Sequence, residues 1–416
     1  DGGVWRSTDT GDTWLSRREG INTYQFYDIC VAQSDPTWLM GGSQDNGVNG
    51  PESGQSWFTS NLFADGMVCN VHPTNAATVY AESQFGNQMK STDSGGSWVD
   101  IQNGIPVDGG FWVTPVAMDP NDPATLFASL DSTTYRTTDG GASWTNQTGF
   151  AAFWIDVSPT DGDYVWAVDF QGVIRSTDGG DAWSAAAPYG FGVGSETKIA
   201  ADPALLGGAL VAFASFDSTV ALVARTTDLG ATWTDVTGDL PAQPVNTLIV
   251  DPSSSDDWYI GTDTGVWRST NGGVNWTPFD DGLPNAVVMD LEIRDSARKL
   301  VCGTYGRGAW ETDLPSVGLG VAAVTPPSRD LMLDPPIPNP VRGAARFRFA
   351  ARHEGPATLS VYDVRGRRIA RVARIPRGDG LVREVVWQAD DVPAGVYFAV
   401  LQAGEERRAR KVVVTR

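Results

Sequence analysis

Six copies of one eight-residue pattern constrain the fold of this chain more than any other feature of its sequence. The pattern, here called the box motif, is Ser or Thr, any residue, Asp or Asn, any residue, Gly, any two residues and Trp; a degenerate seventh copy occupies residues 53–57. Because a repeated unit buries its apolar face only against its neighbours, these copies predict a fold built from repeated units. The acidic or amide residue and the tryptophan of the six copies are Asp9 and Trp14, Asp93 and Trp98, Asp139 and Trp144, Asp178 and Trp183, Asp228 and Trp233, and Asn271 and Trp276.

The residue types of the box motif are those that build and anchor a tight turn. A short carboxylate or amide side chain accepts backbone N–H groups inside a turn, and glycine tolerates the positive φ that the turn requires. The tryptophan then leaves the turn on the next strand and brings a large apolar side chain to the core. Six equivalent positions cannot all be active sites, so we assign the repeated acidic residues a structural role.

The spacing of the box motif matches one blade of a β-propeller. Successive copies, the degenerate one included, lie 39 to 50 residues apart, and a four-stranded blade takes about 40–45 residues. Short apolar segments such as 155–159 and 164–170 lie between the copies and have the composition of strands. The sequence therefore predicts an all-β chain in which residues 1–314 form a seven-bladed β-propeller.

The box motif resembles the Asp box, also called the BNR repeat, of sialidases, sortilin-type receptors, xyloglucanases and photosystem assembly propellers. Sialidase chemistry needs three arginines that converge on a carboxylate and a Tyr/Glu pair, and the chain shows no such pattern. A glycoside hydrolase of the xyloglucanase type stays open, because it needs only two carboxylates that face each other across a cleft.

The two ends of the predicted propeller leave two explanations open. Residues 1–14 match residues 263–276 at nine of 14 positions, so the chain begins at the third strand of a blade. Residues 286–314 supply three strands and no box motif. Either the N-terminal strand completes the last blade, or the chain is a fragment of a longer protein whose first blade is cut; both explanations can hold together.

A change in charge marks a second domain at the C-terminus. Residues 325–416 carry 17 basic and 10 acidic side chains, whereas residues 1–324 carry 13 basic and 40 acidic ones. Residues 315–337 are rich in Pro, Gly and small residues and are predicted to be a linker. Residues 338–416 contain short segments that alternate apolar and polar residues, which predicts a small Ig-like β-sandwich with one buried face per strand.

The C-terminal segment resembles the type A sorting domain of the type IX secretion system. The matching residues are Asn339-Pro340, 361–367, 393–398 and 411–414. The resemblance implies a bacterial protein that is secreted or held at the outer cell surface, with residues 338–416 as the part that the secretion machinery recognises. A stably retained accessory module is the alternative.

Composition excludes several classes of function. So acidic a propeller repels nucleic acid, and no DNA or RNA partner is expected. No apolar run approaches the roughly 18 residues of a membrane helix, so no transmembrane segment is expected. Three scattered cysteines and two histidines form no zinc-binding pattern, and we predict neither a metal nor a cofactor.

Two acidic residues are the candidate catalytic pair. Aligning the predicted first strands of the blades places seven residues at one level: Asp28, Val68, Pro115, Trp154, Lys198, Thr247 and Asp290. In a closed ring of seven blades Asp28 and Asp290 are neighbours at the central channel, and two adjacent like charges raise one pKa, as acid–base work requires. The alternative is that both carboxylates only bond backbone or water at the channel.

The candidate ligand-binding residues follow second strands or are aromatic. Two segments, Asp45-Asn46 and the pair Tyr305 and Arg307, occupy matching places after second strands. They are predicted to form a rim that binds sugar or peptide, together with the aromatic residues Phe111, Trp112 and Trp154. The leading hypothesis is an exported, non-catalytic propeller that binds a glycan or a surface protein. A glycoside hydrolase acting on polysaccharide and a structural spacer of a longer surface protein are the alternatives.

Overall fold

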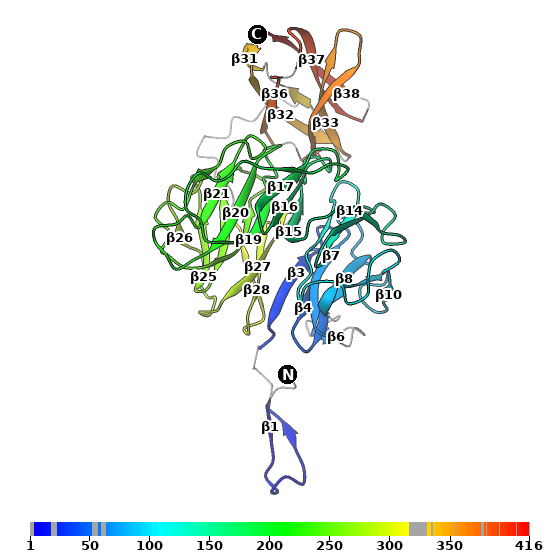
Figure 1. Cartoon of the computed structure of the whole chain (residues 1–416), viewed down its shortest axis with the longest axis vertical. Helices are drawn as coiled ribbons and strands as arrows, with labels where there is room; N and C mark the ends of the chain where they lie inside the picture. Colours follow the sequence, from blue (N-terminus) through cyan, green and yellow to red (C-terminus); the bar gives the residue numbers. More distant parts are fainter. Residues whose placement is uncertain are drawn as a thin grey trace.

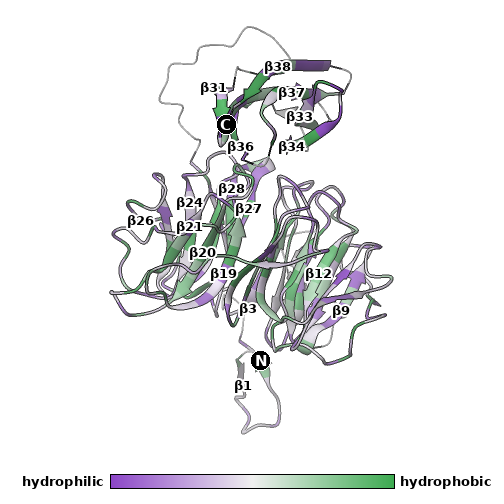
Figure 2. Cartoon of the chain, turned by 45° about the horizontal axis from the view of Figure 1, so that its top comes forward, coloured by the Kyte–Doolittle hydropathy of each residue, from purple (hydrophilic) through white to green (hydrophobic). Residues whose placement is uncertain are grey.

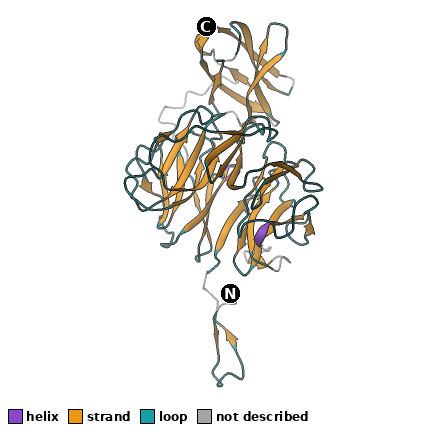
Figure 3. Ribbon diagram, viewed as in Figure 1, coloured by secondary structure: helices purple, strands orange, loops and turns teal. Residues whose placement is uncertain are grey.

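Strands make up nearly all of the regular structure of this chain (Figure 3). Two single-turn 3-10 helices, Gln84–Gly86 and Asp295–Ala297, are the exceptions among the described residues. The all-β prediction is confirmed. The computed structural model describes residues 4–17, 23–51, 57–59, 64–315, 331–333, 336–353, 355–375, 378–379, 381–390, 392–404 and 406–415.

Antiparallel sheets follow one another along the chain, and within each sheet consecutive strands pair (Figure 1). We number these sheets 1 to 7 in chain order, counting only strands in the described part of the chain. Sheet 1 holds β3 (Phe26–Val31), β4 (Leu39–Ser43), β5 (Gly47–Pro51) and β6 (Trp57–Thr59); sheet 2 holds β7 (Gly66–Val71), β8 (Val79–Ser83), β9 (Asn87–Ser91) and β10 (Val99–Asp100); sheet 3 holds β11 (Val116–Met118), β12 (Leu126–Ser129), β13 (Thr134–Thr137) and β14 (Thr145–Thr148).

The later sheets repeat this arrangement, except that the last sheet has three described strands. Sheet 4 holds β15 (Ala152–Val157), β16 (Val165–Asp169), β17 (Gly172–Ser176) and β18 (Ser184–Ala185); sheet 5 holds β19 (Ser195–Ala201), β20 (Ala209–Ala214), β21 (Val223–Thr226) and β22 (Thr234–Asp235); sheet 6 holds β23 (Val245–Val250), β24 (Trp258–Thr262), β25 (Gly265–Ser269) and β26 (Thr277–Pro278); sheet 7 holds β27 (Val288–Arg294), β28 (Lys299–Thr304) and β29 (Ala309–Asp313).

The first strands of these sheets pack side by side in a closed ring. Each first strand contacts the first strand of the next sheet, and β27 of sheet 7 contacts β3 of sheet 1. Buried apolar side chains fill the space between neighbouring sheets, as where Trp166 of sheet 4 meets Trp233 of sheet 5, and strands such as β12 and β20 are largely green, the colour of hydrophobic residues, in Figure 2. This is the arrangement of a β-propeller, as predicted.

The box motifs form the predicted turns. In all six copies the acidic or amide oxygen accepts the backbone N–H four residues further on, as in Ser97 N–H to Asp93 Oδ1 at 2.8 Å. The hydroxyl of the first motif residue donates to the same oxygen in each copy. The glycine adopts positive φ, 89° at Gly95, where a side chain would be strained. Of the degenerate copy, only its last residue, Trp57, lies within the described residues, where it begins β6.

The tryptophans of five copies enter the core, and the first copy differs. Trp144, Trp233 and Trp276 are buried and Trp98 and Trp183 are partly buried, as predicted. The prediction is wrong for the first copy, because its tryptophan, Trp14, is 59% exposed. The reason is that its hairpin has no neighbouring sheet to pack against.

The N-terminal hairpin stands apart from the ring (Figure 1). It consists of β1 (Trp5–Arg6) and β2 (Leu15–Ser16), which pair with each other in the described structure. The arrangement therefore differs from the explanation in which the N-terminal strand completes the last sheet. Strand β29 pairs with β28 and ends sheet 7 in the described part of the chain.

The C-terminal strands enclose a core of their own, formed by residues that include Phe347, Leu359, Trp387 and Leu401. Within the predicted linker 315–337, Leu331–Leu333 form a strand whose two leucines are buried in this core, and Ile337 begins the next strand. The strands are β30 (Leu331–Leu333), β31 (Ile337–Arg342), β32 (Ala344–His353), β33 (Ala357–Asp363), β34 (Arg368–Ile375), β35 (Gly378–Asp379), β36 (Arg383–Gln388), β37 (Gly395–Ala403) and β38 (Glu406–Val414).

Two groups of C-terminal strands face this core. Strand β32 pairs with β30, β31, β35 and β36, whereas β33 pairs with β34 and β37, and β37 pairs with β38. Strand β31 joins the groups, because its Val341 also pairs with Val414 of β38. We call strands β30–β38 the C-terminal unit. It meets the propeller through basic side chains of β34: Arg371 lies 3.8 Å from Asp161, and Arg374 donates to the carbonyl of Asn121 at 3.4 Å.

The box turns should depend on an acceptor oxygen rather than on a negative charge. Replacing Asp228 by Ala removes the acceptor for the N–H and hydroxyl of Thr232, and we expect a loss of about 1–2 kcal/mol in the free energy of unfolding. Asp228→Asn should retain most of the free energy of unfolding, because an amide oxygen, that of Asn271, accepts the equivalent N–H at 2.9 Å in another copy. Urea unfolding followed by tryptophan fluorescence measures both. Equal losses in the two variants would contradict the role of the acceptor.

Candidate functional site

The first strands of sheets 1 to 7 line a central cavity of about 340 Å³. Ionisable side chains gather in its wall: Asp28 from β3, Asp156 from β15, Lys198 from β19 and Glu292 from β27. Asp290 of β27 is 1% exposed, and its Oδ1 forms an ion pair with Lys198 Nζ. Of the residues that the sequence aligns at one level, Lys198 and Asp290 are thus in direct contact.

The buried carboxylates of this cavity accept main-chain hydrogen bonds from the neighbouring sheet. Asp28 Oδ2 accepts the N–H of Cys69 at 2.9 Å, and Asp290 Oδ2 accepts the N–H of Ile29 at 3.2 Å. Asp156 Oδ2 likewise accepts an N–H of sheet 5, that of Ala201, at 2.7 Å. Each of these bonds joins the first strands of adjacent sheets. The contacts give Asp28 and Asp290 a structural role, and their role in catalysis stays a hypothesis.

Burial and crowding shift the protonation of this cluster. Burial, reinforced by the charge of Asp290, raises the pKa of Asp28 well above its usual value. The same two causes raise the pKa of Glu292 to about 8, and burial raises the pKa of Asp156 to about 6. Burial opposes the charge of Lys198, but the carboxylates of Asp290 and Asp28 outweigh it and raise the pKa of this amine. The lysine is therefore the cation that holds the acidic cluster together at neutral pH.

Lys198 also contacts an aromatic ring in the cavity. Its Nζ lies 4.5 Å from the ring centroid of Trp154, which is a cation–π geometry. Trp154, predicted to belong to a ligand-binding rim, therefore lies in the wall of the central cavity. Its ring is engaged by the ammonium group rather than grouped with Trp112.

A second group of side chains lies at one face of the ring, which we call the rim face. The rim face carries the loops between second and third strands and the connections from each sheet to the next. The opposite face carries the box turns and the turns between first and second strands, and the C-terminal unit contacts it at Asn121 and Asp161. Because antiparallel strands reverse at each turn, these loops gather at opposite ends of the sheets.

Aromatic side chains from several sheets touch one another on the rim face. Phe85 and Trp112 meet edge to face at 5.4 Å, Phe111 lies 6.3 Å from Phe153, and Phe153 lies 4.3 Å from Phe170. The exposed fractions are 41% for Phe85, 43% for Trp112 and 77% for Phe170. These contacts form two groups, one around Trp112 and one around Phe153, which are linked by the neighbouring residues Phe111 and Trp112. We define the aromatic rim as both groups together with the hydrogen-bonded Tyr27: Tyr27, Phe85, Phe111, Trp112, Phe153 and Phe170.

Polar groups continue the aromatic rim toward sheets 1 and 7. Trp112 Nε1 donates to the hydroxyl of Tyr27 at 3.1 Å, and that hydroxyl donates to Gln44 Oε1 at 2.7 Å. Burial raises the pKa of Tyr27, and the nearby charges of Asp65 and Tyr305 add to the shift. The network fixes the tryptophan and places hydrogen-bonding groups beside exposed rings.

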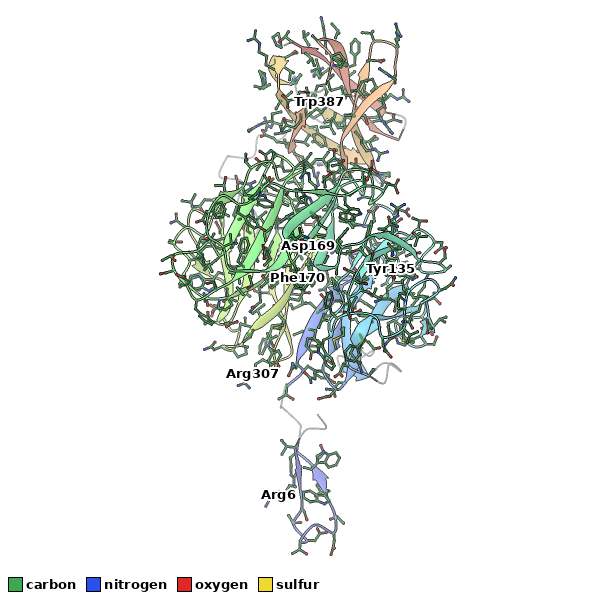
Figure 4. All side chains as sticks on the ribbon, in the orientation of Figure 1. Arg6, Tyr135, Asp169, Phe170, Arg307 and Trp387 are labelled. Carbon is green, nitrogen blue, oxygen red and sulfur yellow. The ribbon has the colours of Figure 1, made fainter. Side chains whose placement is uncertain are left out.

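The remaining predicted rim residues also lie on this face. Asp45, with φ of 59°, donates its N–H to Asp65 at 2.6 Å, and the side chain of Asn46 donates to the carbonyl of Gln44. Tyr305 is 49% exposed and forms a bridge with Gln25 just before β3. Arg307 is exposed at the end of the propeller nearest the N-terminal hairpin (Figure 4).

Sequence reasoning missed several residues of both groups. Lys198 was aligned with Asp28 and Asp290 but received no role, although an amine at a level occupied by two carboxylates signals an ion pair. Tyr27, Phe85 and Phe170 were not selected, since an aromatic residue next to a strand usually belongs to the core. Only the folded arrangement shows that these rings meet on one face.

The described residues contain no group of three or more His, Cys, Asp or Glu side chains placed to hold a metal ion. The three cysteines are buried and unpaired. Among the helices of the described residues, none has the length and apolar character that a membrane crossing requires.

Comparison with known proteins identifies the fold and no family. No protein-family model and no curated protein matches the sequence. A GH74 enzyme of Niastella koreensis matches with a TM-score of 0.56 at 15% identity, covering 94% of this chain and 73% of that chain. The GH74 xyloglucanase of Xanthomonas campestris matches with 0.56 at 14% identity over 97% and 75%, and YCF48 of Cyanidioschyzon merolae with 0.53 at 14% over 71% and 96%. At such identities the likeness supports a β-propeller fold alone.

The acidic cluster makes stability depend on pH. Glu292 has a pKa of about 8 in the folded chain against an ordinary 4.5, so between these values the folded state binds more protons than the unfolded state. The free energy of unfolding should therefore rise as pH falls from 8 to 6, by up to about 1.4 kcal/mol per pH unit for this group. Urea midpoints at several pH values measure the slope.

The matched variant for this measurement is Glu292→Gln, which removes the titrating group and keeps the side-chain size. We expect a smaller slope in this variant and a higher midpoint at pH 8, because one buried negative charge is gone. A slope equal to that of the unmodified protein would contradict the role of Glu292.

Proposed function

We propose that this chain is an exported β-propeller that binds an uncharged glycan through the aromatic rim. The observation that carries the proposal is the two neighbouring groups of aromatic rings, three of them 41–77% exposed, on the face opposite the C-terminal unit. Apolar rings that stay in contact with solvent and lie beside oriented polar groups mark a ligand site more often than a structural one.

The polar surroundings of the rim favour a sugar as the ligand. Gln44, Asp45 and Asp65 lie next to Tyr27 and Trp112 and offer donors and acceptors for hydroxyl groups. The carboxylates near the rim, which include Asp108 beside Asn87, repel an anionic polysaccharide. The solved structures that match the fold include a xyloglucanase, an enzyme whose name refers to an uncharged polysaccharide. That likeness is consistent with a carbohydrate ligand.

A glycoside hydrolase is the second candidate, and one observation favours it. Asp28 has a raised pKa next to a second carboxylate, as a general acid does. Against it, Asp28 and Asp290 are 5% and 1% exposed, and both already accept main-chain N–H groups. The aromatic rim therefore supports binding better than the cavity supports hydrolysis. A structural spacer requires neither the aromatic rim nor the cavity, and it would bind no glycan.

For the C-terminal unit we propose recognition by a type IX secretion system, with retention of the protein at the outer surface of a bacterium or its release. The support is the match at Asn339-Pro340 and 361–367, in the order expected for a sorting domain. In the folded chain Asn339 lies beside the final strand, where its side chain donates to the carbonyl of Lys411 and accepts the N–H of Val413. Two of the matching segments are thus held together.

The binding proposal predicts the effect of truncating the rim. Trp112→Ala and Phe170→Ala should each weaken binding to an uncharged polysaccharide such as xyloglucan by about tenfold or more. Phe398→Ala is the matched control, since Phe398 is an aromatic residue of the C-terminal unit with a similar 40% exposure, and it should leave binding unchanged. Isothermal titration with xyloglucan, a mixed-linkage glucan and polygalacturonate measures the affinities.

The same panel separates the alternatives. If the protein releases reducing ends from a polysaccharide and Asp28→Asn abolishes that release, the function is hydrolysis rather than binding alone. Absence of binding to every polysaccharide would favour the spacer, and equal affinity for polygalacturonate would contradict the choice of an uncharged ligand.

The export proposal predicts that residues 331–416 are required for transport. In a bacterium with a type IX secretion system, the chain preceded by its export signal should reach the outer surface or the medium. Removing 331–416 should leave it in the periplasm, as measured by protease accessibility on intact cells. Equal surface accessibility of both forms would contradict the role of this segment.

A further inference from the structure

Two of the three cysteines lie in neighbouring first strands and face the same interface between sheets. Cys30 belongs to β3 of sheet 1 and Cys69 to β7 of sheet 2, and both are buried in one apolar cluster. The residues that precede them, Ile29 and Val68, belong to two other clusters. Because side chains alternate between the two faces of a strand, Cys30 and Cys69 point toward each other from opposite sides of the interface between sheets 1 and 2.

Hydrogen bonds fix the height of the two thiols at this interface. Asp28 Oδ2 accepts the N–H of Cys69 at 2.9 Å, so Cys69 lies beside the segment of β3 that carries Cys30. Cys69 Sγ lies 3.6 Å from the carbonyl oxygen of Met40, and Met40 pairs directly opposite Cys30 in sheet 1. Burial raises the pKa of Cys69, and its hydrogen bond with the thiol of Cys30 adds to the shift. The two side chains are therefore in contact.

Packing alone does not require thiols at these two positions. Cys30 and Cys69 stand two residues and one residue beyond the level at which the first strands align. At the interface between sheets 5 and 6 the same two positions are Ala200 and Leu248, which share an apolar cluster. An alanine thus satisfies the packing at the position of Cys30, and a pair of facing cysteines adds a chemical possibility that the apolar pair lacks.

We propose that Cys30 and Cys69 join in a disulfide that ties sheet 1 to sheet 2 when the chain folds in an oxidising compartment. The oxidant is a second disulfide, that of a protein thiol oxidant or of oxidised glutathione. Each thiol gives up its proton, the two sulfurs bond to each other, and the two electrons reduce the disulfide of the oxidant to two thiols. Export, as proposed above, supplies such a compartment, since disulfides form and persist outside the cytosol. The pairing itself depends on neither a ligand nor an export route.

The order of folding gives the oxidant access to the thiols. Contact between β3 and β7 closes a shorter loop than contact between β3 and β27, which completes the ring. Because a shorter loop costs less entropy, we expect sheets 1 and 2 to pack before the ring closes. In the closed ring Cys30 and Cys69 are 5% and 4% exposed, and a disulfide formed during folding is shielded from reductants.

The bond adds a covalent link beside the hydrogen bond from Cys69 to Asp28. The loop that it closes contains the other strands of sheet 1, β4, β5 and β6. Closing this loop reduces the conformational freedom of the unfolded chain and so stabilises the folded chain. Sheet 1 carries Tyr27 of the aromatic rim and sheet 2 carries Phe85, so the same link holds together two sheets that build the rim.

Refolding in a glutathione buffer tests the pairing in the full chain. The chain is unfolded in urea with a reducing agent, diluted into a mixture of reduced and oxidised glutathione, and then alkylated under denaturing conditions. Peptide mass spectrometry of the monomer identifies linked, glutathione-bound and alkylated cysteines. Cys302 is the internal control, because it lies in β28 within a different apolar cluster.

We expect the linked peptides of Cys30 and Cys69 in a yield about tenfold or more above that of any link to Cys302, since a disulfide needs two side chains that already meet. Refolding in reduced glutathione alone should leave all three thiols alkylated. The proposal is overturned if Cys30 and Cys69 stay alkylated or carry glutathione in monomers refolded in the oxidising mixture. Links that form only between two chains overturn it as well.

Thermal unfolding gives a second readout with a matched variant. Protein refolded in reduced glutathione should unfold about 5 °C or more below protein refolded in the oxidising mixture. Cys302→Ala should show the same difference. Cys30→Ala should show none, and it should fold because alanine fills the equivalent position at Ala200. An equal difference in Cys30→Ala and the unmodified protein would contradict the pairing.

Discussion

The constraint on which this structure depends is the inner edge of each sheet. The first strand of a sheet has a partner strand on one side only, so its N–H groups on the other side face the centre of the ring, and a buried N–H without an acceptor is costly. Asp28, Asp290 and Asp156 supply acceptors across the gap between sheets. The ring is thus joined by side chains where no further strand can pair.

This solution brings acidic groups together at the centre. Carboxylates that bridge neighbouring sheets lie close to one another around the cavity, and burial makes their charged forms unfavourable. Lys198 offsets part of that cost through Asp290 and contacts Trp154 on its other side. Raised pKa values therefore arise here from the demands of the fold. The same values on an exposed cleft would indicate acid–base chemistry, and this is why the functional proposal rests on the aromatic rim.

The rim follows from a different property of the propeller. Turns at the ends of the sheets tolerate almost any sequence, because they lie outside the packed layers between sheets. Aromatic residues of neighbouring sheets, such as Phe111 and Phe153, can then meet on one face without disturbing the core. The N-terminal hairpin shows the opposite case, in which Trp14 has core chemistry but no neighbouring sheet in this arrangement.

Local chemistry made much of the fold predictable. The box motif predicts its own hydrogen bonds, because the acceptor of Asp93 and the N–H of Ser97 are four residues apart in one turn. The period of the motif predicts the propeller, and alternation predicts the strands of the C-terminal unit. The strand Leu331–Leu333 was missed because three residues in a Pro-rich segment carry no periodic signal, and only the core of the C-terminal unit reveals that they are buried.

The candidate site was predictable only in part, for a physical reason. Each sheet has a first strand with equivalent positions, so sequence alignment alone places Asp28 and Asp290 at the same level of the ring. Which charge neutralises them, which N–H groups they accept and which exposed rings touch on the rim depend on how the ring closes, and closure is set by packing between residues that are hundreds of positions apart. The sequence by itself therefore determined the repeated unit and the chemistry of its turns. Only the tertiary structure decided that the central acids join the sheets and that aromatic rings gather, partly exposed, on one face of the ring.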